Sequence, residues 1–194
     1  MSVTVNFHGD LATLLRRQWR AQGHIQVAAG RIASIKDVVE SFGLPHTEVG
    51  SLLVDECEVG FSHPVKSDCQ IDVQPITAPW DIMEPCLLRP QPLAKLRFLV
   101  DINVNKLGRL LRMAGFDAAS HPHWDDAELA ACAEAEQRLL LSKDRGLLMR
   151  KQVHFGRLVR ASDPTKQLQE IISLLGLHNQ LQPLSRCLEC NTPL

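Results

Sequence analysis

The stretch FLVDINVNKLGRLLRMAGFD, residues 98–117, decides the fold of the C-terminal half of this 194-residue chain. The apolar run at 96–100 is typical of a short strand buried on both faces, and Asp101 follows it directly. From 104 to 116 the apolar residues recur with the period of an amphipathic helix, and Gly115 is suited to end that helix. A strand that leads through a carboxylate into a helix is the first part of an α/β unit.

Further strands and helices alternate after this stretch. They are predicted at 116–120 (FDAAS, strand), 125–137 (an Ala- and Glu-rich helix), 138–142 (RLLLS, strand), 154–160 (HFGRLVR, strand) and 166–176 (the closing helix). Asp163 and Pro164 form a helix start, and Gly176 forms a helix stop. This alternation predicts a small, mostly parallel sheet of the α/β class.

The N-terminal part has a different order of elements. Strands are predicted at 2–9, 24–29, 49–54 and 70–76, and a helix at 34–43 that Ser34 caps and Gly43 ends. The order strand, strand, helix, strands is that of an α+β β-grasp, or ubiquitin-like, fold. Sulfur carriers of this fold end in a free Gly-Gly, whereas here the corresponding stretch runs on as QPITAPW, which disfavours carrier chemistry.

Prolines mark the boundary between these parts, because four of them fall within residues 79–92 and hold the chain extended. Net charge changes there from −3 over residues 1–78 to +3 over residues 95–180. The predicted organisation is a β-grasp domain at 1–78, a Pro-rich linker at 79–94, a parallel-sheet domain at 95–180 and a C-terminal tail at 181–194.

Composition excludes several classes of protein. The chain is 45% hydrophobic and 22% charged, which is ordinary for a globular protein. No apolar run is long enough for a membrane span, and the N-terminus lacks the features of a signal peptide, so we expect a cytoplasmic protein with reduced cysteines and no membrane partner. Aromatic residues make up only 5%, which argues against a secreted carbohydrate-binding module or an aromatic RNA-stacking platform.

Acidic residues follow two of the predicted parallel strands. Asp101 and Asp144 both fall at carboxyl ends, where open α/β sheets bind their ligands, and Asn103 supplies a further oxygen nearby. Asp125 and Asp126 open the Ala-rich helix, where one of them is explained by the helix dipole. Several carboxylates brought together favour a hard cation, Mg²⁺ or Mn²⁺, which can support phosphodiester cleavage.

Basic residues border these acids. Lys106, Arg109 and Arg112 share one broad face of the helix that leaves Asp101, and residues 138–160 contain seven Lys or Arg but one acid. Such a border suits a site that holds phosphates. Arg112 lies too far along the helix to bind a metal, so it either contacts a distant phosphate or forms an ion pair inside the domain.

The sequence resembles a known family over nearly its whole length. The runs FLVDINVNKLGRLLRMAGFD (98–117), DDAELAACAEAEQRLLLSKDRGLLMR (125–150) and SRCLECNTPL (185–194) resemble the PIN-like RNases known as the Mut-seven C-terminal domain. In several bacterial members a ubiquitin-like domain comes first, and SIKDVVESFGLPHTEVGSLLVD (34–55) resembles its most recognisable stretch.

The resemblance implies roles for individual residues. Asp101, Asp126 and Asp144 match the catalytic acids that bind Mg²⁺ or Mn²⁺, with Asp125 as a neighbour. Ser142 stands where the family usually has Thr, and its hydroxyl would take part in catalysis by hydrogen-bonding a metal-bound water. The recurring basic positions, which with Asn103 would contact the substrate, are Lys106, Arg109, Arg112 and Arg145. Larger PIN nucleases carry one more acid, for which no clear equivalent exists here, so the sequence does not decide between one bound metal ion and two.

The tail contains one CxxC motif, Cys187 and Cys190. A structural zinc site needs four ligands, and the second CxxC of the family's zinc ribbon is missing from this sequence. The chain is therefore truncated, or the ribbon has been lost, or a partner chain supplies the other zinc ligands.

These observations predict a metal-dependent ribonuclease, a hydrolase acting on RNA phosphodiester bonds. Whether the substrate is tRNA, mRNA or rRNA stays open, and the ubiquitin-like domain would bind a protein partner. The alternative is a non-catalytic RNA- or protein-binding module, such as a regulatory or toxin–antitoxin-type component, which would use the same basic border without a metal.

Overall fold

The computed structural model describes residues 2–20, 22, 24–28 and 34–194. The chain forms two compact units, the first made of residues 1–76 and 86–90 and the second of residues 77–85 and 91–194.

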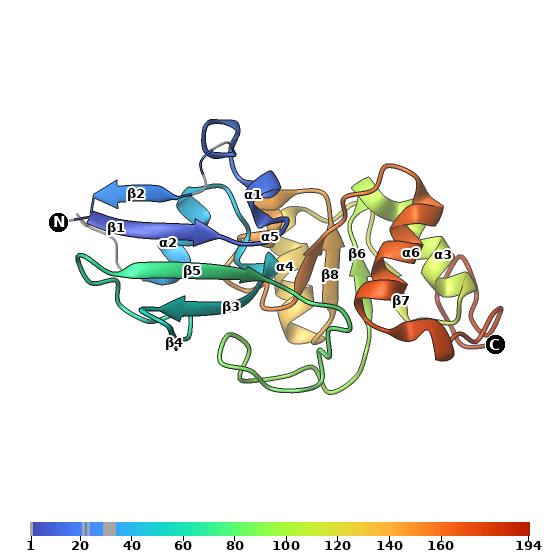
Figure 1. Ribbon diagram of the computed structural model, residues 1–194. Helices are drawn as coiled ribbons and strands as arrows, with labels where there is room; N and C mark the ends of the chain where they lie inside the picture. The colour runs from blue at the N-terminus through green and yellow to red at the C-terminus, as the bar shows by residue number, and fades with distance from the viewer. Residues whose placement is uncertain (1, 21, 23, 29–33) are drawn as a thin grey trace. The chain divides into compact units, whose positions relative to one another are not determined.

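The first unit has a mixed five-stranded sheet with strand order β2-β1-β5-β3-β4 (Figure 1). Its elements are β1 (Ser2–Phe7), α1 (Leu11–Leu14), a 3-10 turn (Arg17–Trp19), β2 (Ile25–Ala28), α2 (Ile35–Ser41), a second 3-10 turn (His46–Glu48), β3 (Val49–Val54), β4 (Cys57–Glu58) and β5 (Gln70–Pro75). Strands β1 and β5 pair in parallel at the centre, and the other pairs are antiparallel. This is a β-grasp fold, as the order of elements predicted.

The core of the first unit follows from the sequence pattern. Val3 and Val5 alternate with polar residues along β1, and both are fully buried. Ser34 caps α2 by accepting a hydrogen bond from the backbone N–H of Asp37, as predicted. The short α1 and β4 were not predicted, and Ala29, the last residue of the predicted second strand, lies outside the described residues.

Side chains of the Pro-rich segment 79–94 are buried in the two units. Arg89 is buried in the first unit, where its guanidinium donates to the carbonyls of Val49 and Thr47, each at 3.0 Å. Ile82 and Leu93 belong instead to the hydrophobic core of the second unit. Proline spacing alone could not reveal these contacts, because they depend on the other side chains between the prolines.

The second unit has a wholly parallel four-stranded sheet with strand order β7-β6-β8-β9. Its elements are β6 (Phe98–Val100), a 3-10 turn (Ile102–Val104), α3 (Asn105–Met113), β7 (Ala118–Ser120), α4 (Asp126–Ala135), β8 (Leu139–Ser142), α5 (Arg145–Leu148), β9 (Gly156–Leu158), α6 (Pro164–Leu174) and a last 3-10 turn (Leu177–Asn179). The predicted α/β class with a mostly parallel sheet is therefore confirmed.

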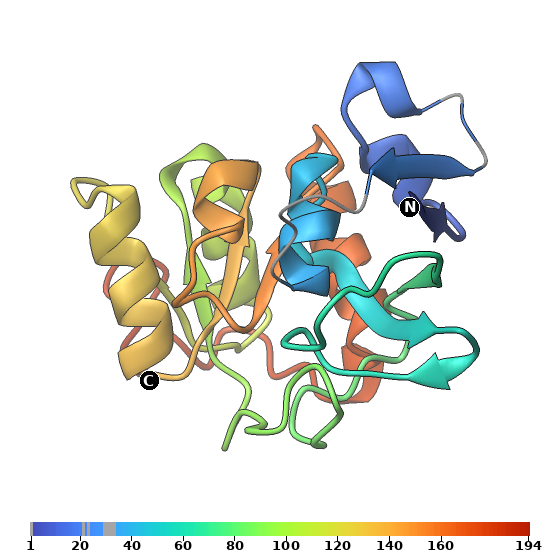
Figure 2. The ribbon, with the colours of Figure 1, turned by 90° about the vertical axis from the view of Figure 1, so that its left-hand side faces the viewer.

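Helices cover both faces of this sheet: α3 and α6 lie on one face, and α4 and α5 on the other (Figure 1 and Figure 2). Alternate strand residues such as Phe98 and Val100 enter one core cluster with Leu107 and Leu111 of α3. Gly108 of α3 faces Val100 of β6, and a Cβ at Gly108 would lie in van der Waals contact with the Val100 side chain, 3.4 Å away.

The observed elements are shorter than predicted at several ends. The helix expected at 104–116 begins with a 3-10 turn and is α-helical over Asn105–Met113. Gly115 then adopts a positive φ of +99°, which suits a helix stop. The strand expected at 154–160 is reduced to Gly156–Leu158, and the four-residue α5 was not predicted.

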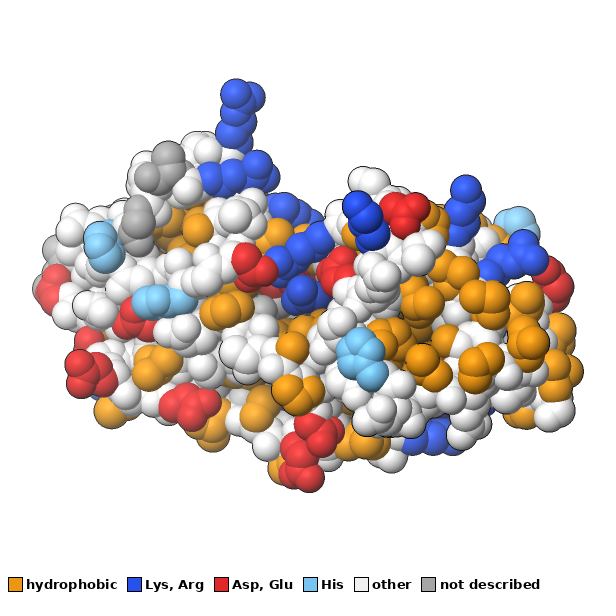
Figure 3. Space-filling model, turned by 45° about the vertical axis from the view of Figure 1, so that its right-hand side comes forward, with side chains coloured by type: hydrophobic (Ala, Val, Ile, Leu, Met, Phe, Trp, Pro, Cys, Tyr) orange, Lys and Arg blue, Asp and Glu red, His pale blue; other side chains and the backbone are white. Residues whose placement is uncertain are grey.

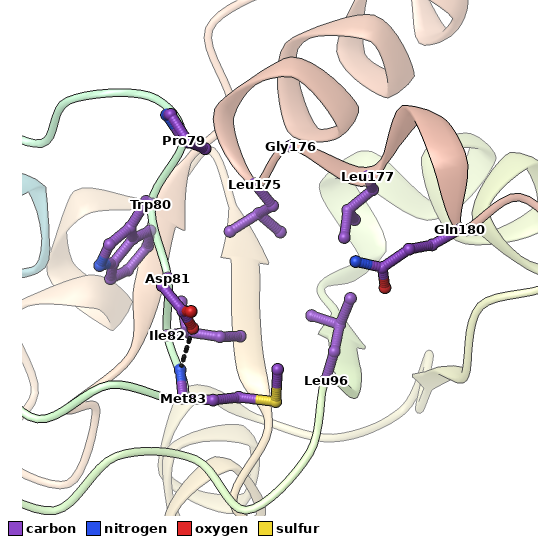
Figure 4. A pocket seen from close by; sticks show the side chains of 10 residues that line it. All are labelled: Pro79, Trp80, Asp81, Ile82, Met83, Leu96, Leu175, Gly176, Leu177 and Gln180. Carbon is purple, nitrogen blue, oxygen red and sulfur yellow. Dashed lines mark hydrogen bonds between the residues drawn. The ribbon is translucent and has the colours of Figure 1, made fainter.

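A mostly apolar cavity of about 180 Å³ lies in the second unit, between the segment that contains Trp80 and Met83 and the end of α6 (Figure 4). None of its lining residues is a predicted site residue.

Figure 3 shows hydrophobic side chains gathered at the surface on its right-hand side, where this unit lies. Within the described ranges, no helix has both the length and the apolar character needed to cross a membrane.

Candidate nuclease site

The strand order brings two of the predicted acids together. Strand β6 comes first in the second unit, β7 pairs with one edge of it, and β8 pairs with the other edge. The strand order therefore switches sides between β6 and β8, although all the strands are parallel. Ligands bind at such switch points, beyond the carboxyl ends of the strands. Asp101 follows β6, and Ser142 and Asp144 lie at the end of β8, so all three occupy this edge.

Ser142 links the ends of these two strands. Its hydroxyl donates to Oδ2 of Asp101 at 2.5 Å and accepts from the backbone N–H of Asp144 at 2.8 Å. Ser142 is fully buried and Asp101 is 6% exposed, so these bonds are shielded from water. The hydroxyl that the sequence assigned to catalysis therefore orients Asp101.

Asn103 completes this network. Its side-chain amide donates to Oδ2 of Asp101 at 2.5 Å and to the Ser142 hydroxyl at 3.2 Å. Its carbonyl oxygen accepts from the backbone N–H of Lys143 at 3.0 Å. Asn103 was predicted to contact substrate, but its amide is committed to holding the loops after β6 and β8 in register.

Asp144 is exposed and caps α5. One of its oxygens, Oδ1, accepts from the backbone N–H groups of Gly146 at 2.6 Å and Leu147 at 3.2 Å. The carboxylate is thereby held at the sheet edge by the backbone that follows it.

The two neighbouring acids of α4 have different roles. Asp125 is the N-cap: its Oδ1 accepts from the backbone N–H groups of Ala127 and Glu128, and Glu128 reciprocates on the Asp125 backbone N–H at 2.8 Å. This capping box occupies the Asp125 carboxylate. Asp126 is the member of the pair that faces the other acids.

Desolvation, followed by the negative charges of Asp144 and Asp101, raises the pKa of Asp126 above its ordinary value, although Arg150 opposes this shift. Arg150 forms a long ion pair with Asp126, in which Nη2 of Arg150 lies 4.0 Å from Oδ2 of Asp126. The three predicted catalytic acids therefore lie within electrostatic range of one another. In the part of the chain that the structure describes, no group of three or more His, Cys, Asp or Glu side chains is gathered closely enough to hold a metal ion.

A cavity of about 400 Å³ is lined by residues that follow Asp101 in the chain, among them Lys106, and by Lys143, which directly precedes Asp144. Asn103, which hydrogen-bonds to Asp101, also lines this cavity. The buried Gln167 also lines it, with an Oε1 atom that has no hydrogen-bond partner among the described residues. Lys143 was not among the predicted substrate contacts, although its position directly before Asp144 was a signal for it.

The other predicted cations on α3 face the C-terminal tail. Arg112 is 6% exposed, and its guanidinium donates to the carbonyls of Ala118, Leu188 and Glu189 and to the Ser120 hydroxyl, at 2.7–2.9 Å. Of the two roles that the sequence left open for Arg112, these contacts correspond to the internal one. Arg109 forms an exposed ion pair with Glu189 at 2.8 Å.

The remaining basic residues are not all on the border of the site. Arg138 is buried and pairs with Asp117 and Glu136, and Arg157 is also buried. The excess of positive charge over residues 138–160 thus overstates the number of cationic side chains that a substrate could contact. Arg145 is partly exposed at the start of α5, beside Asp144, and its contact with substrate stays a prediction.

The CxxC segment forms a hydrogen-bonded turn. The Cys187 backbone N–H donates to the Thr192 carbonyl at 2.9 Å, and the Cys190 thiol lies 2.7 Å from Oγ1 of Thr192. Hydrogen bonding to Thr192 lowers the pKa of Cys190 to about 7. Asn191 anchors the turn by bonding to Asp117 and to the backbone of Ala118.

Comparison with known families gives two matches that together span both units. Residues 96–194 match the family model of the Mut7-C RNAse domain, and residues 1–81 match that of the Mut7-C ubiquitin domain. Comparison with curated proteins and with solved structures finds no match.

Proposed function

Because this chain belongs to the family of the Mut7-C RNAse domain, we propose that its second unit hydrolyses RNA phosphodiester bonds with the help of Mg²⁺ or Mn²⁺. The observation that supports this proposal most directly is the joining of Asp101 and Asp144 through the buried hydroxyl of Ser142, at the switch point of a parallel sheet.

The chemistry of the donor set suits a hard divalent cation, although among the described residues the three carboxylates are not gathered as closely as a bound ion would hold them. Asp101, Asp126 and Asp144 offer carboxylate oxygens, the ligands that Mg²⁺ and Mn²⁺ prefer. Desolvation, and after it the charges of Asp144 and Asp101, raise the pKa of Asp126, and a bound cation would offset both effects. When bound, such a cation supplies Lewis-acid activation of water and stabilises negative charge on the leaving oxygen.

The chain's own residues would position the reacting groups. Ser142 and Asn103 hold the Asp101 carboxylate in one orientation through Oδ2. Lys106 and Lys143, which line the same cavity, would neutralise phosphates of the bound strand. Positioning and charge neutralisation of this kind account for much of the catalysis of phosphoryl chemistry.

Three further predictions belong to this proposal. We propose that the first unit binds a protein partner. Carrier chemistry would need a free carboxylate after β5, whereas the chain continues from β5 into the second unit, which leaves binding as the expected role. tRNA, mRNA and rRNA all stay candidate substrates, and zinc binding at Cys187 and Cys190 also stays a prediction. In the described structure these two cysteines are not part of any larger group of potential ligands.

The test is a cleavage assay on total RNA and on a labelled single-stranded RNA, with Mn²⁺, with Mg²⁺ and with EDTA. Asp101→Asn and Asp144→Asn should reduce cleavage to background while the protein stays folded. Asp163→Asn is the matched control, because Asp163 caps α6 and Asn serves equally well as a cap.

Cleavage that survives in EDTA, or in both site variants, would contradict the proposal. RNA binding that needs no divalent cation and yields no product would instead support the non-catalytic binding module.

A further inference from the structure

The loop between β7 and α4 carries a stacked aromatic pair. The rings of His121 and Trp124 are nearly parallel, with centroids 3.5 Å apart and an interplanar angle of 9°. A turn holds the two residues together, because the Trp124 backbone N–H donates to the His121 carbonyl at 3.2 Å. The pair is therefore organised before any ligand arrives.

Trp124 differs from the other two tryptophans in its surroundings. Trp19 and Trp80 each contact the ring of a buried phenylalanine, Phe42 and Phe155, and so contribute to a core. Trp124 is 37% exposed and stacks on a histidine. Its indole ring is thus partly presented to solvent on a loop, and its partner in the stack is an imidazole rather than a core side chain.

The position of this loop relates the pair to the acids. It follows β7, so it lies at the same carboxyl edge of the parallel sheet as Asp101 and Asp144. Trp124 directly precedes Asp125, whose capping box fixes the start of α4, and stands two residues before Asp126. The capping box therefore also limits where the indole ring can be.

We propose that His121 and Trp124 form a stacking platform for one unpaired base of the RNA substrate beside the acidic site. This inference rests on the proposed ribonuclease function and adds a preference for single-stranded RNA. Every base has a π-face that can stack on an aromatic ring, so the platform would tolerate any sequence. A base within a duplex is already stacked and paired, so it could not use the platform.

The low aromatic content of the chain argues against an extended aromatic surface, and this proposal does not need one. A single exposed ring, supported from behind by His121, is sufficient for one base. The phosphates on either side of that base would be held by cations such as Lys143.

The first test measures the affinity for a labelled single-stranded RNA in an Asp144→Asn background, which prevents turnover. Trp124→Ala should weaken binding by roughly tenfold or more, and Trp124→Phe should restore most of it. The salt dependence of binding should keep its slope, because no phosphate contact is lost. Met113→Ala is the control, since Met113 is a similarly exposed apolar residue, 40% exposed, on the distant end of α3.

The second test uses RNAs that carry one abasic nucleotide at successive positions around the mapped cut. At one position, the missing base should weaken binding to the protein with intact Trp124 as much as Trp124→Ala weakens binding of intact RNA. The abasic RNA and the Trp124→Ala protein together should then show no further loss of affinity. Unchanged affinity of Trp124→Ala for intact RNA, or an equal additional loss at every abasic position, would overturn the platform.

Failure of the platform and failure of the ribonuclease proposal are distinguishable. If the platform alone is wrong, the Trp124→Ala protein without the Asp144 change still cleaves RNA with an unchanged KM. If hydrolysis alone is wrong, the unsubstituted protein yields no product, yet Trp124→Ala still weakens RNA binding. Thermal melting of each variant confirms that it is folded.

Discussion

The hydroxyl of Ser142 donates to the Asp101 carboxylate at 2.5 Å across the ends of the neighbouring strands β8 and β6. The same oxygen accepts from the backbone N–H of Asp144, so one buried atom connects the loops that carry both acids. This arrangement makes the site dependent on a residue that need not touch the substrate.

Ser142→Ala should therefore reduce stability and activity together. The substitution removes one of the two side-chain donors to the buried Asp101 carboxylate, leaving the Asn103 amide, and it removes the acceptor of the Asp144 N–H, which costs about 1–3 kcal/mol. Ser142→Thr retains the hydroxyl and should behave much like the unsubstituted protein. Denaturant midpoints and RNA cleavage rates measure both effects, with the exposed Ser173→Ala as control. A Thr variant as impaired as the Ala variant would show that the hydroxyl is not what matters.

Asp126→Asn should stabilise the protein at neutral pH. Because the folded-state pKa of Asp126 is raised, its ionised form opposes folding above that pKa, and this cost disappears as the pH falls below the ordinary Asp value of about 3.9. The melting temperature of the variant should exceed that of the unsubstituted protein at pH 7, and the two should converge in acid. Added Mn²⁺ should raise the melting temperature of the unsubstituted protein more than that of the variant.

The neighbouring substitution Asp125→Ala should act in the opposite direction. Asp125 caps α4, so its removal should destabilise the fold by about 0.5–2 kcal/mol at neutral pH. Asp125→Asn, which preserves the cap, serves as control. If Asp125→Ala and Asp126→Asn shifted melting in the same direction, the division of roles between these two acids would be wrong.

Arg112→Ala should lower the melting temperature and loosen the C-terminal tail. The side chain makes four hydrogen bonds in a buried setting, so its loss should cost at least about 2 kcal/mol. Proteolysis within 181–194 should become faster, and the salt dependence of RNA binding should not change. Arg109→Ala, which removes only an exposed ion pair, should cost about 1 kcal/mol or less. Unchanged melting with a salt slope smaller by about one would instead identify Arg112 as a phosphate contact.

Cys190 should react with iodoacetamide in a pH-dependent manner, half-maximally near pH 7, because hydrogen bonding to Thr192 favours its thiolate. Thr192→Val removes the side-chain hydrogen bond and should move this midpoint toward that of an ordinary thiol. Cys69 and Cys132, whose pKa values burial raises, should stay largely unreacted at the same pH. Mass spectrometry of the modified peptides distinguishes these cysteines.

Much of the fold could be predicted because local pattern and tertiary structure agree. The buried strand before Asp101 and the amphipathic helix after it, the caps at Ser34 and Asp163, and the helix stop at Gly115 each follow from chemistry that acts within a few residues. The identities of Asp101, Asp126 and Asp144 as the candidate acids were also available from sequence, because each stands at a predicted end of a strand or start of a helix.

Only the tertiary structure decided which side chains are available for chemistry. In sequence, Arg112 and Lys106 are equivalent members of one basic face, yet Arg112 is buried against the tail, 76 residues away in the chain, and Lys106 lines a cavity. The family resemblance favoured Asp126 over Asp125, but only the structure shows the capping box that engages the Asp125 carboxylate. The reason is physical: a charged side chain is assigned by the partners that burial brings to it, and those partners come from distant parts of the chain, whereas strands, helices and their caps are specified by neighbours along it.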